Sequence, residues 1–296
     1  MGASASGGNL VGVVVCTIGR VEPLSALLAS LANQTSDDFV VSICAQGNFA
    51  EVEALVDRAR GRLRVPISLI ATERGLSRGR NQAVKALPAA VDWLVFPNDT
   101  STYPPEAIER ILSLPPSTGA ACMAVRDPFG VKFDLPTDEP LDRRNVWAVI
   151  SPGLIMRTSI FNDLHGFDES LGTGALTAWQ SGEETDLLLR FMADAADSAF
   201  AWLPETMVGG VADAQGLSPL ERRRKLRAYS RGYGRVLRRH QYGWGWGIRA
   251  LVAGLTFGLR HGRQYSAVDG VPVLIGRIEG LLGRTFGDSD RAAVSR

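Results

Sequence analysis

The sequence predicts an α/β protein with a mainly parallel, twisted sheet flanked by helices and a helical extension at its C-terminal end. Two observations predict the sheet: short apolar runs alternate with segments of helical period between residues 11 and 125, and the 296 residues can bury a substantial core. A third observation, a helix-period segment with strong start signals over residues 218–240, predicts the extension. The composition, 45% hydrophobic and 21% charged, is that of a globular protein.

Four apolar runs in the first 125 residues have the length and composition of buried strands. Each is short, rich in β-branched residues and bounded by turn residues, as the strands of a parallel sheet are. They are VGVVVC at 11–16, FVVSIC at 39–44, ISLIA at 67–71 and WLVF at 93–96.

Segments of helical period separate these strands. Leucines recur at helical spacing after Pro23, and apolar residues do so again through residues 52–56. Ser77 is expected to cap a third helix and Pro104 to begin a fourth. Alternation of this kind makes successive strands parallel, so their carboxyl ends share one edge of the sheet, where ligands bind. Four loops are therefore expected at this edge, at residues 17–20, 46–48, 72–75 and 98–100.

The alternation loosens after residue 125. An apolar segment at 147–156 and a Gly-rich turn at 166–179 precede a helix that begins near Ser181. The later helix over 218–240 has Ser218 in the cap position, followed by Pro and, three residues after the cap, Glu. The expected organisation is a flexible leader, a main domain in two halves and a basic helical extension, with boundaries at 1–9, 10–125, 126–216 and 217–296.

Charge is distributed unevenly along the chain. Residues 201–296 carry 16 Lys and Arg against 7 Asp and Glu, whereas residues 1–200 carry 16 against 24, so a net charge of +1 hides excesses of nine positive and eight negative charges. An acidic body suits a site that handles cations, and a basic C-terminal third suits anionic lipid or phosphate. No nucleic-acid motif accompanies the basic part, so no nucleic-acid partner is expected.

The C-terminal extension has features that suit a membrane surface. Nine basic residues lie within the helix over 218–240, and two tryptophans open the apolar segment that follows. About ten uncharged residues separate Arg249 from Arg260, and a spanning helix needs about twenty, so no transmembrane segment is expected. Residues 218–262 are therefore interpreted either as a peripheral membrane contact or as helices packed on the main domain.

The three cysteines indicate a reducing compartment. Cys16, Cys44 and Cys122 lie in apolar runs without zinc spacing, which is typical of small buried hydrophobes. This predicts a cytoplasmic location, with the peripheral contact on the inner face of the cell membrane. The three histidines lack metal-ligand spacing and are interpreted as structural or surface residues.

An acidic cluster in SGEETD offers a candidate general base. Glu183, Glu184 and Asp186 place three carboxylates within four positions at the start of an apolar helix. Ser181 and Glu184 have capping-box spacing, which accounts for one of the three acids. Clustered carboxylates raise one another's pKa, which suits a base that takes a proton from a hydroxyl near neutral pH.

Two further segments have the residue types of an anion site and a cation site. In TERGLSRGRNQAVKAL a Gly-Leu-Ser turn opens a helix that carries Arg78, Arg80 and Asn81, which suits a diphosphate but equally a solvated helix face. In WLVFPNDTSTYPP, Asp99 either closes a strand or holds a metal ion.

Taken in order, four motifs resemble the large family 2 of glycosyltransferases, which has a GT-A fold. The motifs cover roughly residues 10–210 and read VVVCTIGRVEPLSALLASLANQT, ERGLSRGRNQAV, WLVFPNDTSTYPP, and LHGFDESLGTG with SGEETDLLLR. The resemblance implies a nucleotide-diphosphate-sugar donor, inversion at the anomeric carbon, a glycan or lipid-linked acceptor, a place in cell-envelope polysaccharide biosynthesis and usually a divalent metal. The looser pattern after residue 125 suggests that the second half of the main domain is built around an acceptor pocket.

The resemblance also implies a role for individual residues. Asp99 falls at the metal-binding acidic motif, so Mg²⁺ or Mn²⁺ is the expected cofactor. Glu183 and Glu184 fall at the acidic pair that supplies the general base. Glu184, at the second position, is the expected base, and the capping-box interpretation would shift that role to Glu183. Asp186 and Trp179 would border the acceptor. Residues expected to bind the donor are Thr17, Ile18, Gly19, Arg20, Gln46, Asn48, Gly75, Arg80, Asn81, Asn98 and Thr100.

Two departures from the family pattern leave parts of this assignment open. The metal motif keeps a single acid, Asp99, where family members commonly have two or three, although diphosphate oxygens and waters can complete a Mg²⁺ or Mn²⁺ shell. The loop after Cys44 offers Gln46 and Asn48 where the family usually offers an acid to the nucleobase.

Two other classes of protein share parts of this pattern. A sugar-nucleotide pyrophosphorylase would favour a Gly-rich phosphate loop after the first strand, where this chain has one glycine in CTIGR. A degenerate transferase that binds nucleotide or lipid without turnover would explain the thinned metal motif, whereas the complete SGEETD cluster favours an active enzyme.

Overall fold

In the computed structural model the described residues are 9–195, 197–210, 216–262 and 264–287, so nearly all of the expected leader lies outside them. Contacts divide the chain into two compact units. The sheet unit consists of the described residues of Met1–Arg74, Gly79–Gly166 and Leu187–Ala212. The helical unit consists of those of Gly75–Arg78, Phe167–Asp186 and Asp213–Arg296. The sequence alone places a boundary near residue 216, whereas contacts also group residues 75–78 and 167–186 with the C-terminal segment.

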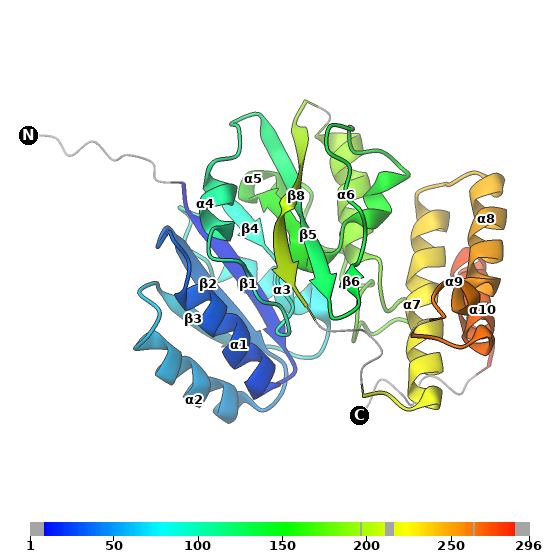
Figure 1. Ribbon diagram of the computed structural model, residues 1–296, viewed down its shortest axis with the longest axis horizontal. Coiled ribbons are helices and arrows are strands. Elements are labelled where there is room, and N and C mark those ends of the chain that lie inside the picture. The colour runs from blue at the N-terminus through cyan, green and yellow to red at the C-terminus, as the bar shows by residue number, and fades with distance from the viewer. Residues whose placement is uncertain (1–8, 196, 211–215, 263, 288–296) are drawn as a thin grey trace, which may run out of the picture. The chain divides into compact units, whose positions relative to one another are not determined.

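The sheet unit contains a mostly parallel sheet, as the sequence predicts. Among the described residues it has eight strands in the order β3-β2-β1-β4-β7-β5-β6, with β8 paired to β5 (Figure 1). The four predicted strands are present and parallel: β1 (Val11–Thr17), β2 (Phe39–Ala45), β3 (Ile67–Ala71) and β4 (Trp93–Val95). The remaining strands are β5 (Thr118–Asp127), β6 (Gly130–Val131), β7 (Leu154–Arg157) and β8 (Ala199–Gly209). β7 runs antiparallel to both β4 and β5.

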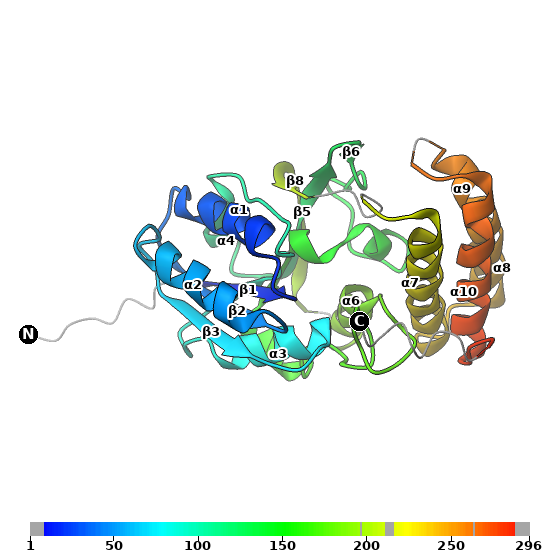
Figure 2. The same ribbon diagram turned by 90° about the horizontal axis from the view of Figure 1, so that it is seen from below.

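Helices cover both faces of this sheet (Figure 2). On one face the leucines of α1 (Val21–Ala32) and the apolar residues of α2 (Phe49–Arg60) and α4 (Ala107–Leu112) form a single core with alternate residues of β1 and β2. On the other face α3 (Leu76–Lys85) lies against the same strands, and Ser42 Oγ donates a hydrogen bond to the Ala83 carbonyl at 2.8 Å. The remaining helices are η1 (Asn145–Ala148), η2 (Ser151–Gly153), α5 (Thr158–Asp163) and α6 (Glu183–Asp194), whose first residues belong to the helical unit.

The helical unit contains α7 (Pro219–Arg239), α8 (Trp244–Leu255), α9 (Phe257–Arg260), η3 (Ala267–Asp269) and α10 (Gly270–Leu282). The predicted capping box is confirmed, because Glu221 N donates to Ser218 Oγ and Ser218 N donates to the Glu221 carboxylate at 2.9 Å. Gly276 and Gly280 of α10 lie against the backbone of α7, where a Cβ would clash. This close approach buries Glu279 of α10 between two α7 arginines.

Among the described residues, no helix has both the length and the apolar character that crossing a membrane requires.

Candidate functional site

Side chains of the sheet unit connect the carboxyl ends of β1 and β4. Asp99, which follows β4, is 1% exposed, and its Oδ2 accepts a hydrogen bond from Thr17 Oγ1 at 2.7 Å. Arg20 binds the same carboxylate at two points, with Nε 3.1 Å from Oδ2 and Nη2 in contact with Oδ1. Thr17 Oγ1 also accepts hydrogen bonds from the backbone N of Gly19 and of Arg20. One hydroxyl therefore fixes both the turn that carries Arg20 and the carboxylate that Arg20 binds.

Arg80 reaches the loop after β4 from α3. Its side chain is 0% exposed; Nη1 donates to Ser151 Oγ at 3.0 Å, and Nη2 donates to Asn98 Oδ1 at 3.2 Å and to the Phe96 carbonyl at 3.5 Å. Asn81 is also buried. The alternative of a solvated helix face is therefore wrong for Arg80. Burying a guanidinium is costly without polar partners, which these contacts supply.

Two amide side chains brace the neighbouring loops. Gln46 Nε2 donates to Thr72 Oγ1 at 3.1 Å and to the Glu73 carbonyl at 2.8 Å, so it connects the ends of β2 and β3. Asn48 has a φ of 46° directly before α2, and its Nδ2 lies 3.4 Å from the Gly19 carbonyl. The structure thus places both amides at the predicted edge, and contact with a nucleobase stays a prediction.

The other predicted donor residues differ in their surroundings. Ile18 is 54% exposed beside the buried Thr17, and Thr100 is partly buried beside Asp99. Gly75 precedes α3 with a φ of 134°, a conformation that favours glycine, and it belongs to the helical unit.

The residues around Asp99 do not fit a divalent metal ion. Arg20 and Thr17 together engage both oxygens of its carboxylate, and the neighbouring Asn98 Oδ1 accepts from Arg80. In the part of the chain that the structure describes, no group of three or more His, Cys, Asp or Glu side chains could hold a metal. Mg²⁺ and Mn²⁺ need several oxygen ligands, and this loop presents oxygens already bound by protein donors.

The acidic pair of the sequence opens α6 in the helical unit. The helix begins at Glu183, and the backbone N of Asp186 donates to the Gly182 carbonyl at 2.9 Å, so Gly182 occupies the cap position. Ser181 lies one residue earlier, and its Oγ donates to the Tyr229 carbonyl at 2.6 Å. The capping-box interpretation of this helix start, with Ser181 as the cap, is therefore wrong.

The two carboxylates of this pair differ in exposure. Glu183 is 5% exposed, and a Cβ on Gly172 would lie 3.2 Å from its Oε2, so the Gly-rich loop packs against this carboxylate. Gly172 has a φ of 99°, which few other residues adopt. Glu184 is partly exposed. Exposure therefore favours Glu184 over Glu183 as the carboxylate that can reach a substrate.

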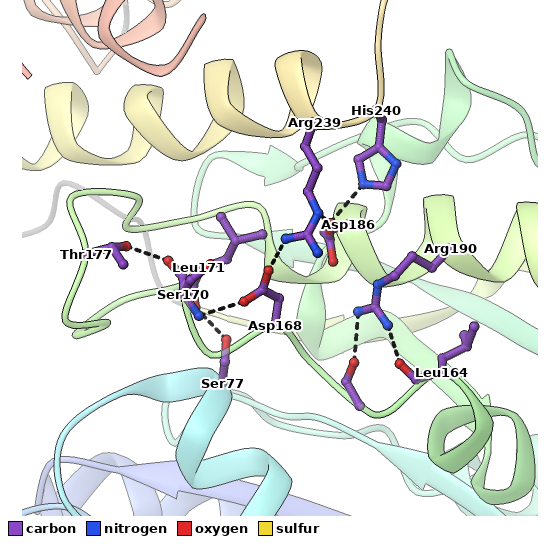
Figure 3. A network of polar contacts seen from close by, with 11 residues as sticks. Ser77, Leu164, Asp168, Ser170, Leu171, Thr177, Asp186, Arg190, Arg239 and His240 are labelled. Atoms are coloured by element: carbon purple, nitrogen blue, oxygen red, sulfur yellow. Dashed lines mark hydrogen bonds and ion pairs between the residues drawn. The ribbon is translucent and has the colours of Figure 1, made fainter. Parts of the chain in front are cut away.

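Asp186 is the buried member of a polar network with the end of α7 (Figure 3). Its side chain is 0% exposed, and its Oδ1 lies 2.8 Å from His240 Nε2 and 3.3 Å from Arg239 Nε. Arg239 also binds Asp168 of the Gly-rich loop. Burial acts to raise the pKa of Asp168, but hydrogen bonds from Ser170 and Arg239 outweigh it and hold that pKa below its usual value. The network ties the loop, the start of α6 and the end of α7 together within the helical unit.

Sequence reasoning missed several members of these networks. No pattern in the sequence indicated Ser151, whose Oγ accepts a hydrogen bond from Arg80. Nor did any pattern indicate Arg239 and His240, which contact Asp186. Asp168 does lie in the LHGFDESLGTG motif, so a signal existed for that residue. The guanidinium of Arg235 of α7 lies over the ring of Trp179, the predicted acceptor residue, with Cζ 5.5 Å from the ring centre.

Comparison with known proteins supports the glycosyltransferase resemblance. No family model matches the chain. A 105-residue stretch, 36% of the chain, is 27% identical to an uncharacterized glycosyltransferase of Haemophilus influenzae and spans 34% of that protein.

The fold is that of solved glycosyltransferases. A structure of S. aureus TarS (residues 1–349) in complex with UDP-GlcNAc has a TM-score of 0.55 with 16% identity, over 94% of this chain and 93% of that one. The mannosyltransferase PcManGT from Pyrobaculum calidifontis, in complex with GDP-Man and Mn²⁺, has a TM-score of 0.59 with 12% identity, over 92% and 87%. The predicted GT-A type fold, a mostly parallel sheet flanked by helices, is thus confirmed.

Proposed function

We propose that this chain is an inverting glycosyltransferase that moves a sugar from a nucleotide-diphosphate donor to a hydroxyl of a glycan or lipid-linked acceptor. The observation that carries the proposal is the polar edge at the ends of β1 and β4, where Arg20 contacts Asp99 and Arg80 contacts the adjacent Asn98. It lies in a fold shared with proteins that bind UDP-GlcNAc or GDP-Man. Ligands of such sheets bind at the carboxyl ends of the strands.

The reaction requires two kinds of group, and the chain has a candidate for each. As the C1–O bond of the donor breaks, negative charge grows on the leaving diphosphate, and guanidinium groups stabilise that charge. Arg20, whose side chain is 50% exposed, supplies such a group, and the buried Arg80 adds a positive charge beside Asn98. The acceptor hydroxyl must lose a proton, and we assign that role to Glu184 because Glu183 is packed against the Gly-rich loop. Single displacement with this base inverts the anomeric carbon.

Asp186 receives a positioning role instead of a place beside the acceptor. Asp186 lies two residues after Glu184 on α6. Its side chain is fully buried and contacts Arg239 and His240. A fixed Asp186 holds the first turn of α6 and thereby orients Glu184. The family implies acceptor contact through Trp179, which stays a prediction.

Replacing Glu184 by Gln tests the assignment. Glu184→Gln removes the base and should lower the rate of hydrolysis of UDP-GlcNAc or GDP-Man, whichever the wild type cleaves, by about 10²–10⁴-fold. Thermal stabilisation by the same nucleotide sugar should be retained, because Glu184 is not assigned to donor binding. Glu169→Gln is the matched control, since Glu169 is an exposed carboxylate of the same unit that pairs with Arg78. Full activity in Glu184→Gln would remove the base assignment.

We propose that the peripheral membrane contact expected of the C-terminal helices involves α8 and α9. The arginines of α7 are largely engaged within the unit, because Arg227 and Arg231 bind Glu279, and two others bind Asp269. On α8, by contrast, exposed apolar side chains recur at spacings of three and four residues along one face, and α9 adds one more. They are Trp244 (84% exposed), Ile248 (52%), Val252 (58%), Leu255 (53%) and Leu259 (70%).

Basic residues accompany this apolar face. Arg249 and Arg260 line an open groove of about 410 Å³ together with Ile248 and Val252. Apolar side chains with arginines beside them match the acyl region and the phosphates of an anionic bilayer. We therefore propose that this face contacts the inner surface of an anionic membrane.

Vesicle sedimentation tests this contact. The full chain should bind vesicles that contain phosphatidylglycerol more strongly than vesicles of phosphatidylcholine alone, and salt should weaken the binding. Val252→Ser should reduce it several-fold, whereas Leu220→Ser, an exposed apolar position at the start of α7 (59% exposed), should not. Equal effects of both changes, or a concentration-dependent dimer lost in Val252→Ser, would contradict the membrane contact.

A further inference from the structure

We propose that the guanidinium of Arg20 takes the place that a divalent cation would have at Asp99, so that this chain binds the diphosphate of its donor without a metal ion. The inference deepens the proposed function and rests on it. It starts from the disagreement between the metal expected of the family and the donors that surround Asp99.

The contacts from Arg20 and Thr17 engage both oxygens of the buried Asp99 carboxylate. Oδ1 accepts from Nη2, and Oδ2 accepts from both Nε and Thr17 Oγ1. The carboxylate is 1% exposed. A cation could bind it only by displacing Arg20, which would cost the charged hydrogen bonds that now satisfy a buried charge.

Arg20 retains donors for an anionic ligand. Its guanidinium carries five N–H groups in a plane, and the side-on contact through Nε and Nη2 uses two of them. The other N–H groups, on Nη1 and the far side of Nη2, lie on edges that do not face Asp99. The side chain is 50% exposed, so these donors are accessible to a ligand. Phosphate oxygens are the acceptors that a guanidinium fork fits best.

The turn that holds Arg20 is preformed. Thr17 Oγ1 accepts from the N of Gly19 and of Arg20, and Gly19 has a φ of 93° that other residues rarely adopt. A Cβ on Gly19 would lie 2.7 Å from the Gly47 carbonyl oxygen, so the loops after β1 and β2 are in direct contact. A guanidinium that is already fixed in place loses little conformational entropy when it binds an anion. In this respect it resembles a metal ion that is already bound.

Charge also favours an anion at this loop. Arg80 contacts Asn98, and Arg20 contacts the adjacent Asp99. These two guanidinium groups and one carboxylate together carry one net positive charge. Such a group attracts a diphosphate and repels Mg²⁺ or Mn²⁺, because Coulomb energy scales with the product of the charges.

Binding of UDP and GDP, with a chelator or with Mn²⁺, tests the inference. We expect the wild type to bind at least one of the two diphosphates with the same affinity in EDTA and in Mn²⁺, as measured by titration calorimetry. Arg20→Gln should weaken that binding in EDTA by about 10–100-fold, because it removes a charged hydrogen-bonding group. Because Arg20→Gln also frees Asp99, Mn²⁺ should restore part of the affinity in this variant. Electron paramagnetic resonance of Mn²⁺ should then show more bound ion in Arg20→Gln with the diphosphate than in the wild type.

Two variants control for structural damage. Arg64→Gln alters another exposed, ion-paired arginine of the sheet unit and should leave binding unchanged. Arg20→Lys keeps one positive charge without the two-point geometry and should fall between the wild type and Arg20→Gln. Equal affinity of wild type and Arg20→Gln in EDTA would overturn the role of Arg20. A wild type that binds only with Mn²⁺ would overturn the inference and leave the proposed function standing. If neither diphosphate and neither UDP-GlcNAc nor GDP-Man bound under either condition, the proposed function would fail and the inference with it.

Discussion

At the scale of single residues, Gly79 sets how closely α3 approaches the sheet. A Cβ at this position would lie 2.5 Å from Cys16 Sγ, 2.7 Å from Gln46 Nε2 and 3.0 Å from Cys44 Sγ. Gly79→Ala should therefore lower the free energy of unfolding by about 1–3 kcal/mol, because two buried thiols on β1 and β2 cannot move away cheaply. Denaturant unfolding measures this change.

A second glycine provides the control for Gly79. Gly61 ends α2 with a φ of −75°, and a Cβ there would meet the Arg58 carbonyl oxygen at 3.7 Å, an ordinary contact. Gly61→Ala should change the free energy of unfolding by less than about 0.5 kcal/mol. Equal unfolding midpoints for the two variants would show that the close packing at Gly79 carries no energetic weight.

The residue scale also shows where sequence reasoning was limited. The position of Asp99 after a strand was predictable from the apolar run and its turn residues, but its partner Arg20 lies 79 positions earlier in the chain. Only the parallel pairing of β1 with β4 brings the two together. Ser77 was expected to cap α3; it lies inside the first turn instead, and its Oγ donates to the Leu171 carbonyl at 2.6 Å. Local signals cannot specify such long-range partners.

At the scale of elements, prediction succeeded where a single periodic pattern dominated. The strands of the first half and the capping box of α7 follow from hydrophobic period and turn chemistry, and the structure has them at the expected residues. β7 was expected only as an apolar segment, since period alone does not distinguish a strand from a helix or state its direction.

Among the elements, α7 differs most from what its sequence indicated. Its nine basic residues indicated a charged surface, but four of them form ion pairs with Glu279 and Asp269, both 0% exposed. Those acids lie about 50 residues further along the chain, on elements with weak sequence signals of their own. A run of arginines in the sequence therefore does not tell whether the side chains face solvent or form ion pairs between packed helices.

At the scale of the whole molecule, acid should affect the two units differently. Asp168, Asp269 and Glu279 belong to the helical unit. Burial acts to raise the pKa of each, but hydrogen bonds from arginine side chains and backbone N–H groups outweigh burial, so each folded pKa lies below its usual value.

A carboxyl whose folded pKa is lowered stabilises the fold fully above its unfolded pKa of about 4, and that contribution is lost as the pH falls through the folded pKa. As the pH is lowered from about 7 to about 3, amides of α7 and α10 should therefore lose protection against hydrogen exchange at a higher pH than those of β1 and β2. Exchange at each pH, corrected for the intrinsic rate and read by mass spectrometry, measures this order. Glu279→Gln should remove part of the pH dependence and destabilise α7 and α10 at neutral pH by about 3–5 kcal/mol, because Arg227 and Arg231 lose their buried counter-ion. Asp57→Asn, at an exposed ion pair with Arg60, should change neither the pH dependence nor the stability of α7 and α10. Loss of protection in β1 and β2 at a higher pH than in α7 and α10 would contradict the assignment of acid sensitivity to the helical unit.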